Sequence, residues 1–389
     1  MRTAPAMLLL ALCLLPGAGE APREAERLGD DEMEIRRRPG RRWDISRRQE
    51  EAVERGLQWL AENQVLPGGF WPADVGYKVQ DRYGVWNRQV AHVGVTGLAL
   101  TAFLADGHLP GRGRYGRNIA AGLDYILDRV QADGSIEHNG SRMYSHAFAT
   151  LFLAEIYGME KNDRVRRKLR MATRFIVDAQ NAEGGWRYRP KADRSDMSVT
   201  VCQVMALRAA RNVGIHVPYS VIKRAVGYVR RSAVTERDIR QARLQQMYYG
   251  GAVEKGGFKY QLNTDGTPHR VTYPLTAAGV TTLLGAGRYD HTLVEEGLDY
   301  MGRNERLING DPTHYFFYYG HYYAAQAYFT SGDLERWRRY FKTVRRILLK
   351  SQSRDGSWIN DPGPGRVFGT AVATLILEIP YGYLPIFQR

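Results

Sequence analysis

Two carboxylates lie in a short polar loop between two segments with helical periodicity. Asp193 and Asp196 follow Arg187 and Arg189, and an apolar helix is expected to begin near Ser198. A carboxyl group whose pKa is raised by burial can donate a proton to a substrate, so Asp193 and Asp196 are candidate catalytic acids. The alternative is that one of them caps the following helix, a position that aspartate favours.

A second candidate site is the tripeptide Tyr144–Ser145–His146, which opens a predicted apolar helix. Histidine is a common general acid or base, so His146 is a candidate catalytic residue and Tyr144 a candidate for substrate binding. His146, His314 and Asp196 together offer an alternative metal site. No short ligand spacing of the kind found in zinc sites supports that alternative, and we expect neither a metal nor a cofactor.

A third feature is an aromatic run, HYFFYYGHYY, which extends from His314 to Tyr323. Aromatic faces stabilise a carbocation by cation–π attraction, and they also stack on sugar rings. The alternative is that these rings pack within a helical core. The candidates for substrate binding are Tyr144, Trp186, Tyr273, His314, Tyr318 and His321.

The elements that must position these residues recur along the chain. Each repeat has an amphipathic first helix and a second helix that is apolar on nearly every side, which predicts an outer layer and a buried inner layer. Six such pairs can close on themselves, so we predict an all-α protein with a single closed (α/α)6 toroid, an open superhelix being the alternative. The repeats are expected at Ala52–Asp106, Asn118–Met159, from near Val165, from Val221, Thr292–Ser331 and Trp337–Glu378.

A few segments are expected to depart from this plan. The loop of the first repeat, up to Gln89, is long, and the charged insertion Glu236–Lys255 is expected to be an extra loop or short helix. The last ten residues, PYGYLPIFQR, form a predicted closing segment. Ser46 is expected to cap the first helix, with Gln49 three residues later as in a capping box.

The N-terminus has the pattern of an export signal. Residues 1–21 combine Arg2, an apolar run from Met7 to Leu15 and small residues for cleavage. Residues 22–47 are charged and poor in apolar side chains, which predicts a poorly ordered linker, and residues 48–389 are expected to form the toroid. No later stretch is apolar for long enough to cross a membrane. We therefore expect an exported, soluble protein in the periplasm or outside the cell.

The chain of 389 residues carries a formal net charge of +14, which favours anionic partners. Its arginine pairs are scattered over predicted outer helices, and no nucleic-acid-binding motif is recognisable. We therefore expect no nucleic acid partner, whereas a peripheral membrane contact stays open. Cys202 lies in an apolar helix, where a small buried residue is favoured over a nucleophile.

Two segments carry a family resemblance. Gln180–Trp186 (QNAEGGW) and Gln352–Trp358 (QSRDGSW) resemble the QW motif of squalene and oxidosqualene cyclases. Weaker copies are Gly69–Phe70–Trp71, Gln131 with Gly134, and Gly257–Phe258. Residues from about 50 to 380 are thus similar to the prenyltransferase and squalene-oxidase repeat superfamily, which includes class II triterpene cyclases and protein prenyltransferase β-subunits. The resemblance implies an α/α toroid, in agreement with the helix pairs.

The chemistry of that superfamily is only partly retained. Class II cyclases protonate an alkene with the middle Asp of an Asp-x-Asp-Asp motif, and the matching stretch Asp193–Asp196 has Ser195 in that place. Protein prenyltransferases bind zinc through an Asp-x-Cys pair, where this chain has Ser198. The resemblance implies an exported terpenoid cyclase- or prenyltransferase-like enzyme that acts on an isoprenoid or other apolar substrate. A carbohydrate-active toroid, lyase or hydrolase, and a non-catalytic binding scaffold are the alternatives.

Overall fold

The computed structural model describes residues 45–79, 82–244, 253–262, 270–287, 291–307, 312, 314 and 316–387. The predicted signal peptide at 1–21 and nearly all of the predicted linker at 22–47 lie outside these residues. Within the described part of the chain, no helix is both long enough and apolar enough to cross a membrane.

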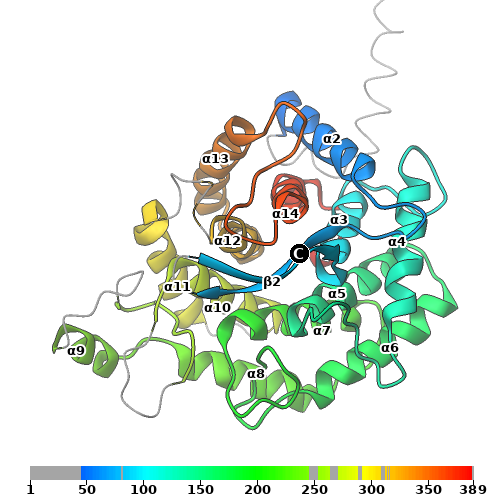
Figure 1. Ribbon diagram of the computed structural model, residues 1–389. Coiled ribbons are helices and arrows are strands. Elements are labelled where there is room, and N and C mark those ends of the chain that lie inside the picture. Colours follow the sequence, from blue (N-terminus) through cyan, green and yellow to red (C-terminus); the bar gives the residue numbers. More distant parts are fainter. Residues whose placement is uncertain are drawn as a thin grey trace, which may run out of the picture.

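An inner ring of helices forms the centre of the molecule (Figure 1). Consecutive inner helices pack against one another, and the last, α14, packs against the first, α3, so that the ring closes. Every residue of α3 is buried, as the apolar sequence on all its sides predicts. The predicted closed toroid is confirmed, and the open superhelix is wrong. The inner helices are α3 (Val93–Ala105), α5 (Met143–Met159), α7 (Met197–Asn212), α10 (Tyr273–Gly285), α12 (Phe317–Ser331) and α14 (Arg366–Glu378).

An outer ring of amphipathic helices surrounds the inner one (Figure 1). In α6 the buried residues include Val165, Leu169, Ala172 and Ile176, three or four positions apart, so one stripe of the helix faces inward. The arginines between them are exposed, whereas Lys168 is partly buried and donates to Val130 O (2.9 Å). The outer helices are α2 (Arg47–Glu62), α4 (Gly116–Arg129), α6 (Asp163–Asp178), α8 (Tyr219–Ser232), α11 (His291–Asn304) and α13 (Leu334–Ser351).

The Gln–Gly–Trp turns link one repeat to the next. Gln180 Nε2 donates to Gly184 O (2.8 Å) in its own turn and to Val221 O (2.9 Å) in the following outer helix. The indole N–H of Trp186 donates back to Ile176 O (2.8 Å) in α6. The same bonds recur at two other turns, Gln64 with Trp71 and Gln352 with Trp358.

Glycine is required in these turns for two reasons. Gly184 and Gly356 have φ angles of +90° and +92°, in the region that L side chains avoid. In addition, a Cβ atom on Gly184 would lie 2.5 Å from Arg224 O of the next outer helix, and one on Gly356 2.5 Å from Arg55 O. The turn and the following helix therefore approach so closely that only glycine fits between them.

The turn at Gln352 closes the ring. Gln352 Nε2 donates to Ala52 O (2.8 Å), which joins the last repeat to the first helix. Ser46 caps that helix as predicted, its hydroxyl accepting from the Gln49 amide. The side chain of Gln49 does not complete a capping box, however, because it is buried and donates to Leu377 O of α14 (2.7 Å). This contact also spans the junction between the two ends of the fold.

Several segments add to the two rings. The expected long loop of the first repeat is instead an antiparallel hairpin of β1 (Pro72–Val79) and β2 (Arg82–Ala91), which crosses one end of the ring (Figure 1). The expected insertion contains α9 (Glu236–Leu244), tethered by a 3.0 Å ion pair between Lys259 and Asp238. The remaining 3₁₀ turns are η2 (Glu305–Leu307), η3 (Ile379–Tyr381) and η4 (Pro385–Phe387). The last two cover the opposite end of the ring against α5, α7, α12 and α14, as predicted for a closing segment.

We predict that Gln352→Ala lowers the free energy of unfolding by about 1–3 kcal/mol, because it removes both hydrogen bonds that the Gln352 side-chain amide donates, one to Gly356 O in its own turn and one to Ala52 O in α2. The measurement is urea-induced unfolding followed by circular dichroism. Gln131→Ala is the matched control, since the Gln131 side chain is exposed and bonds only within its own turn. Its effect is expected to stay within about 0.5 kcal/mol, and equal losses in the two variants would contradict the role of Gln352.

Candidate functional site

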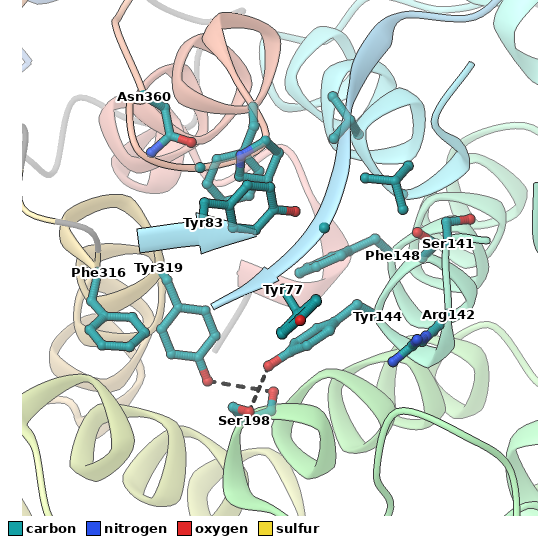
Figure 2. Close-up of a pocket in the computed structure, with 18 of the residues that line it drawn as sticks. Tyr77, Tyr83, Ser141, Arg142, Tyr144, Phe148, Ser198, Phe316, Tyr319 and Asn360 are labelled. Carbon is teal, nitrogen blue, oxygen red and sulfur yellow. Dashed lines mark hydrogen bonds between the residues drawn. The ribbon is translucent and has the colours of Figure 1, made fainter. Parts of the chain in front are cut away.

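A central cavity of about 530 Å³ lies where the N-terminal ends of the inner helices meet the hairpin. Its volume falls within the ~300–1,000 Å³ of small-molecule sites. Figure 2 shows aromatic side chains pointing into it from several helices and from the strands above. The aromatic residues that line it are Tyr77, Tyr83, Trp86, Tyr144, Phe148, Tyr188, Tyr260, Phe316, Tyr319, Tyr322, Tyr323 and Phe368.

Helix α12 presents a different face to the cavity from the one predicted. The lining residues are Tyr319, Tyr322 and Tyr323. Tyr318 instead donates its hydroxyl to Ile359 O (2.9 Å), and His321 Nδ1 lies 3.0 Å from the Tyr340 hydroxyl of outer helix α13. The predicted substrate-binding residues Tyr318 and His321 therefore face away from the cavity.

A chain of hydrogen bonds runs from the cavity wall to a buried carboxyl group. The Tyr144 hydroxyl donates to Ser198 Oγ (2.6 Å), and the Ser198 hydroxyl donates to Asp196 Oδ1 (2.7 Å). In Figure 2, Tyr144 and Tyr319 reach towards Ser198 from two sides of the cavity, and Tyr319 is bonded to Ser198 O (3.5 Å). Tyr144 and Ser198 line the cavity, whereas Asp196 lies directly behind them.

Asp196 combines a structural role with an unusual environment. Its Oδ1 accepts from the Val199 amide (2.8 Å) and so caps α7, as the sequence-based alternative predicted. The carboxyl group is fully buried, and this burial raises its pKa from 3.8 to about 6. Among the described residues, Oδ2 has no hydrogen-bond partner, and Arg187 Nε stands 4.0 Å from it. Asp196 thus holds a proton at a higher pH than an ordinary aspartate.

The other two predicted catalytic residues lie elsewhere. Asp193 is exposed and is not among the residues that line the cavity. His146 is buried between α5 and α6, where Nδ1 accepts from the Ile136 amide (3.0 Å) and Nε2 donates to Ala172 O (3.1 Å). Burial lowers its pKa to about 4. Because backbone groups occupy both ring nitrogens of the neutral imidazole, His146 fastens a turn to a helix.

Three of the predicted substrate-binding residues also lie outside the cavity lining. Trp186 is buried between the layers, where its indole N–H bonds to α6. Tyr273 is buried with its ring 6.2 Å from that of His321, and His314 precedes α12 with Nδ1 accepting from the Phe316 amide (3.2 Å). Of the predicted binding residues, Tyr144 alone lines the cavity. The prediction missed the other aromatic residues of the lining, which come from the hairpin, the inner helices and the loops before them.

The charged groups of the cavity wall are cationic. Arg142 lies over the Trp86 ring, with its guanidinium carbon 4.8 Å from the ring centre, and Arg270 lies over Phe316 at 5.1 Å. No Asp or Glu of the described residues is part of the lining. Nor do the described residues contain a cluster of three or more His, Cys, Asp or Glu suited to a metal, so the alternative site of His146, His314 and Asp196 is not assembled.

The single described cysteine belongs to the same buried network. Cys202 lies one helical turn after Ser198, with its sulfur 3.3 Å from Ser198 O and 2.9 Å from the Tyr323 hydroxyl. Burial raises the pKa of its thiol to about 12, so it stays protonated at neutral pH. This is the buried residue that the sequence predicted, and its protonation argues against a nucleophile.

Comparisons with known proteins support the fold. No family model and no curated protein matches the sequence. Among solved structures, the α-1,6-mannanase GH76A from Salegentibacter sp. HEL1_6 matches with a TM-score of 0.58 at 8% identity, over 85% of this chain and 98% of the mannanase. The type II terpene cyclase MstE from Scytonema, in complex with geranylgeranyl dihydroxybenzoate, matches with a TM-score of 0.53 at 14% identity, over 87% and 98%. A D-mannose isomerase matches with a TM-score of 0.59 at 11% identity, over 85% and 96%.

We predict that Asp196→Asn removes a pH dependence of stability. The folded-state pKa of about 6 exceeds the ordinary 3.8, so the folded wild type binds the proton more tightly than the unfolded chain does. Its free energy of unfolding should therefore fall, relative to the variant's, by on the order of 1–3 kcal/mol as the pH rises from about 4 to about 6. Asparagine keeps the cap oxygen.

Urea unfolding across this pH range, with circular dichroism as the readout, provides the measurement. Asp193→Asn is the control, since Asp193 lies on the surface of the same loop. Parallel pH profiles for the wild type and Asp196→Asn would show that Asp196 is ionised as readily as an exposed carboxylate.

Proposed function

We propose that this protein is a terpenoid cyclase-like enzyme that binds an isoprenoid or similar apolar chain in its central cavity. The observation that carries the proposal is the wall of the cavity, where twelve aromatic side chains surround a space of about 530 Å³. Such a wall buries an apolar chain favourably. The faces of its rings also suit a carbocation that develops along that chain.

The acid in this proposal is Asp196. It is protonated below a pH of about 6, and the Ser198 hydroxyl connects it with the cavity. For proton transfer the hydrogen bond between Ser198 and Asp196 reverses its direction, so that protonated Asp196 donates to Ser198 Oγ and the Ser198 hydroxyl points into the cavity. Asp196 then gives its proton to the Ser198 hydroxyl as that hydroxyl passes its own proton to one alkene carbon, and a carbocation forms on the neighbouring carbon. Ring closure moves the positive charge, and loss of a C–H proton to the same network restores Asp196. The overall reaction is an isomerisation and requires no other reactant.

The hairpin covers part of the cavity, which suits a reactive cation. Hairpin residues Tyr77, Tyr83 and Trp86 contribute to its wall from above, and Asp74 of β1 fastens the hairpin to the loop before α14 through a bond from its amide to Pro364 O (2.9 Å). Such cover limits the access of water, which would otherwise capture the intermediate. The terpene cyclase MstE, whose complex holds a geranylgeranyl compound, supports the proposal through its related fold.

A carbohydrate ligand is the second candidate. Tyr77 and Trp86 are 54% and 39% exposed beside the cavity, with ring centres 5.2 Å apart, as in a stacking platform for sugars. The buried Asn360 Oδ1 at the wall has no hydrogen-bond partner among the described residues. Hydrolysis of a glycosidic bond, however, generally uses a pair of carboxyl groups. The mannanase is inactive when two aspartates are replaced, whereas the described lining here includes no carboxyl group.

We predict that the purified protein binds geranylgeraniol and converts squalene or a prenyl substrate into an isomer. Binding is measured by quenching of tryptophan fluorescence, and turnover by mass spectrometry after gas chromatography. Asp196→Asn should lower turnover by at least about 100-fold while affinity stays within about twofold, since the acid acts only in the transition state. Asp193→Asn should leave both unchanged, because its side chain lies at the surface.

Other results would assign the site differently. Undiminished turnover by Asp196→Asn would show that Asp196 is not the catalytic acid. Binding of mannotriose in place of geranylgeraniol would favour the carbohydrate-active alternative. Binding of the isoprenoid without any product, from all substrates offered, would favour the binding scaffold.

A further inference from the structure

A second hollow of about 520 Å³ adjoins the central cavity. We call it the side pocket. It lies between the turn that leads into α5, which contributes Ser135 and Glu137, and the loop that follows Trp186, which contributes Arg189. Glu137 and Arg189 are exposed, so the side pocket opens at the surface. Nothing in the proposed reaction uses this space.

The side pocket and the central cavity share one wall. Trp86, Gly140, Arg142 and Tyr188 line both hollows. This wall includes the stacked pair of Arg142 and Trp86, in which the guanidinium carbon lies 4.8 Å from the ring centre. Arg142 is partly exposed, and so is Trp86. A ligand that extends past these flat side chains would therefore occupy both hollows at once.

The two hollows differ in chemistry. The central cavity is walled mainly by aromatic rings, whereas the side pocket carries Glu137, Arg142 and Arg189. Arg270 lies on the other side of the central cavity. The two hollows together are therefore lined by three guanidinium groups and one carboxylate, that of Glu137. Guanidinium groups pair with carboxylates and phosphates through two parallel hydrogen bonds. The imidazole of His146, although it lines the side pocket, is already held by backbone groups.

We propose that the side pocket binds the anionic head group of an amphiphile whose apolar chain lies in the central cavity. Arg142 and Arg189 are the residues that recognise this head group, which is a carboxylate or a phosphate. The inference rests on the proposed function, because the cavity must first accept the chain. It adds a requirement for the substrate, namely one apolar end and one negatively charged end.

Three probes with the same C20 chain test this inference: geranylgeraniol, which is neutral, geranylgeranoic acid and geranylgeranyl monophosphate. Affinities are measured on the full chain by quenching of tryptophan fluorescence. The wild type should bind at least one anionic probe about tenfold more tightly than the alcohol, and added salt should reduce this preference. The better of the two anions shows whether the head group is a carboxylate or a phosphate.

Arg189→Gln is the informative variant, because Arg189 lines the side pocket and not the central cavity. This variant should bind the anionic probe about fivefold more weakly than the wild type and bind the alcohol with unchanged affinity. Arg194→Gln is the matched control: it removes the same charge from an exposed position of the same loop that lines neither hollow. It should affect no probe. Circular dichroism verifies that both variants are folded.

The outcomes separate the two proposals. Equal affinity of the wild type for the alcohol and both anions, or equal behaviour of Arg189→Gln and Arg194→Gln, overturns the side-pocket inference while the proposed function stands. Failure of all three probes to bind overturns the proposed function, and the side-pocket inference with it.

Discussion

The hydrogen bonds from Gln64, Gln180 and Gln352 to the next outer helix hold successive repeats at a constant distance. The bond from Gln352 to Ala52 O joins the last repeat to the first. A closed ring leaves neither end of its apolar inner layer exposed, which an open array would have to cap. The central cavity exists because the ring closes around it, so the site depends on bonds that lie far from it.

Closure also decides where polar groups gather. The inner helices present their N-terminal ends to the cavity, and these ends with the loops before them bring Arg142, Ser198 and Arg270 together from distant parts of the sequence. The closing segment covers the opposite end, where Glu155 accepts from the Ile386 amide (3.3 Å). Burial raises the pKa of Glu155 to about 8, so at neutral pH this acid is mainly neutral, as its apolar surroundings favour. Both hollows described above, by contrast, lie at the hairpin end of the ring.

The cavity wall contains many tyrosines, yet the surface that it presents is mainly apolar. Several hydroxyls are paired with one another or with buried groups: Tyr188 with Tyr260 (2.7 Å), Tyr323 with Cys202 (2.9 Å) and Tyr144 with Ser198 (2.6 Å). A buried hydroxyl without a partner would destabilise the fold, whereas these pairs leave the ring faces to form the wall. The network that satisfies Tyr144 is the same one that reaches Asp196. Stability of the wall and access to the acid therefore have a common structural basis.

The sequence by itself determined the two layers of six helix pairs, an aspartate cap at position 193 or 196 and the buried state of Cys202, because each depends on local periodicity or on a residue's immediate neighbours. A closed ring was the favoured prediction over an open superhelix, and only the packing of α14 against α3 decided between them. It did not determine which side of α12 meets the cavity. A helix that is apolar all round has no stripe to orient it, so the sequence predicts Tyr318 and His321 as binding residues, whereas Tyr319, Tyr322 and Tyr323 line the cavity. The contact of hairpin residue Trp86 with Arg142, and the placement of Arg142 and Arg189 around one pocket, were also decided only by the tertiary structure. They bring together residues from separate repeats, which meet only when neighbouring repeats pack against one another.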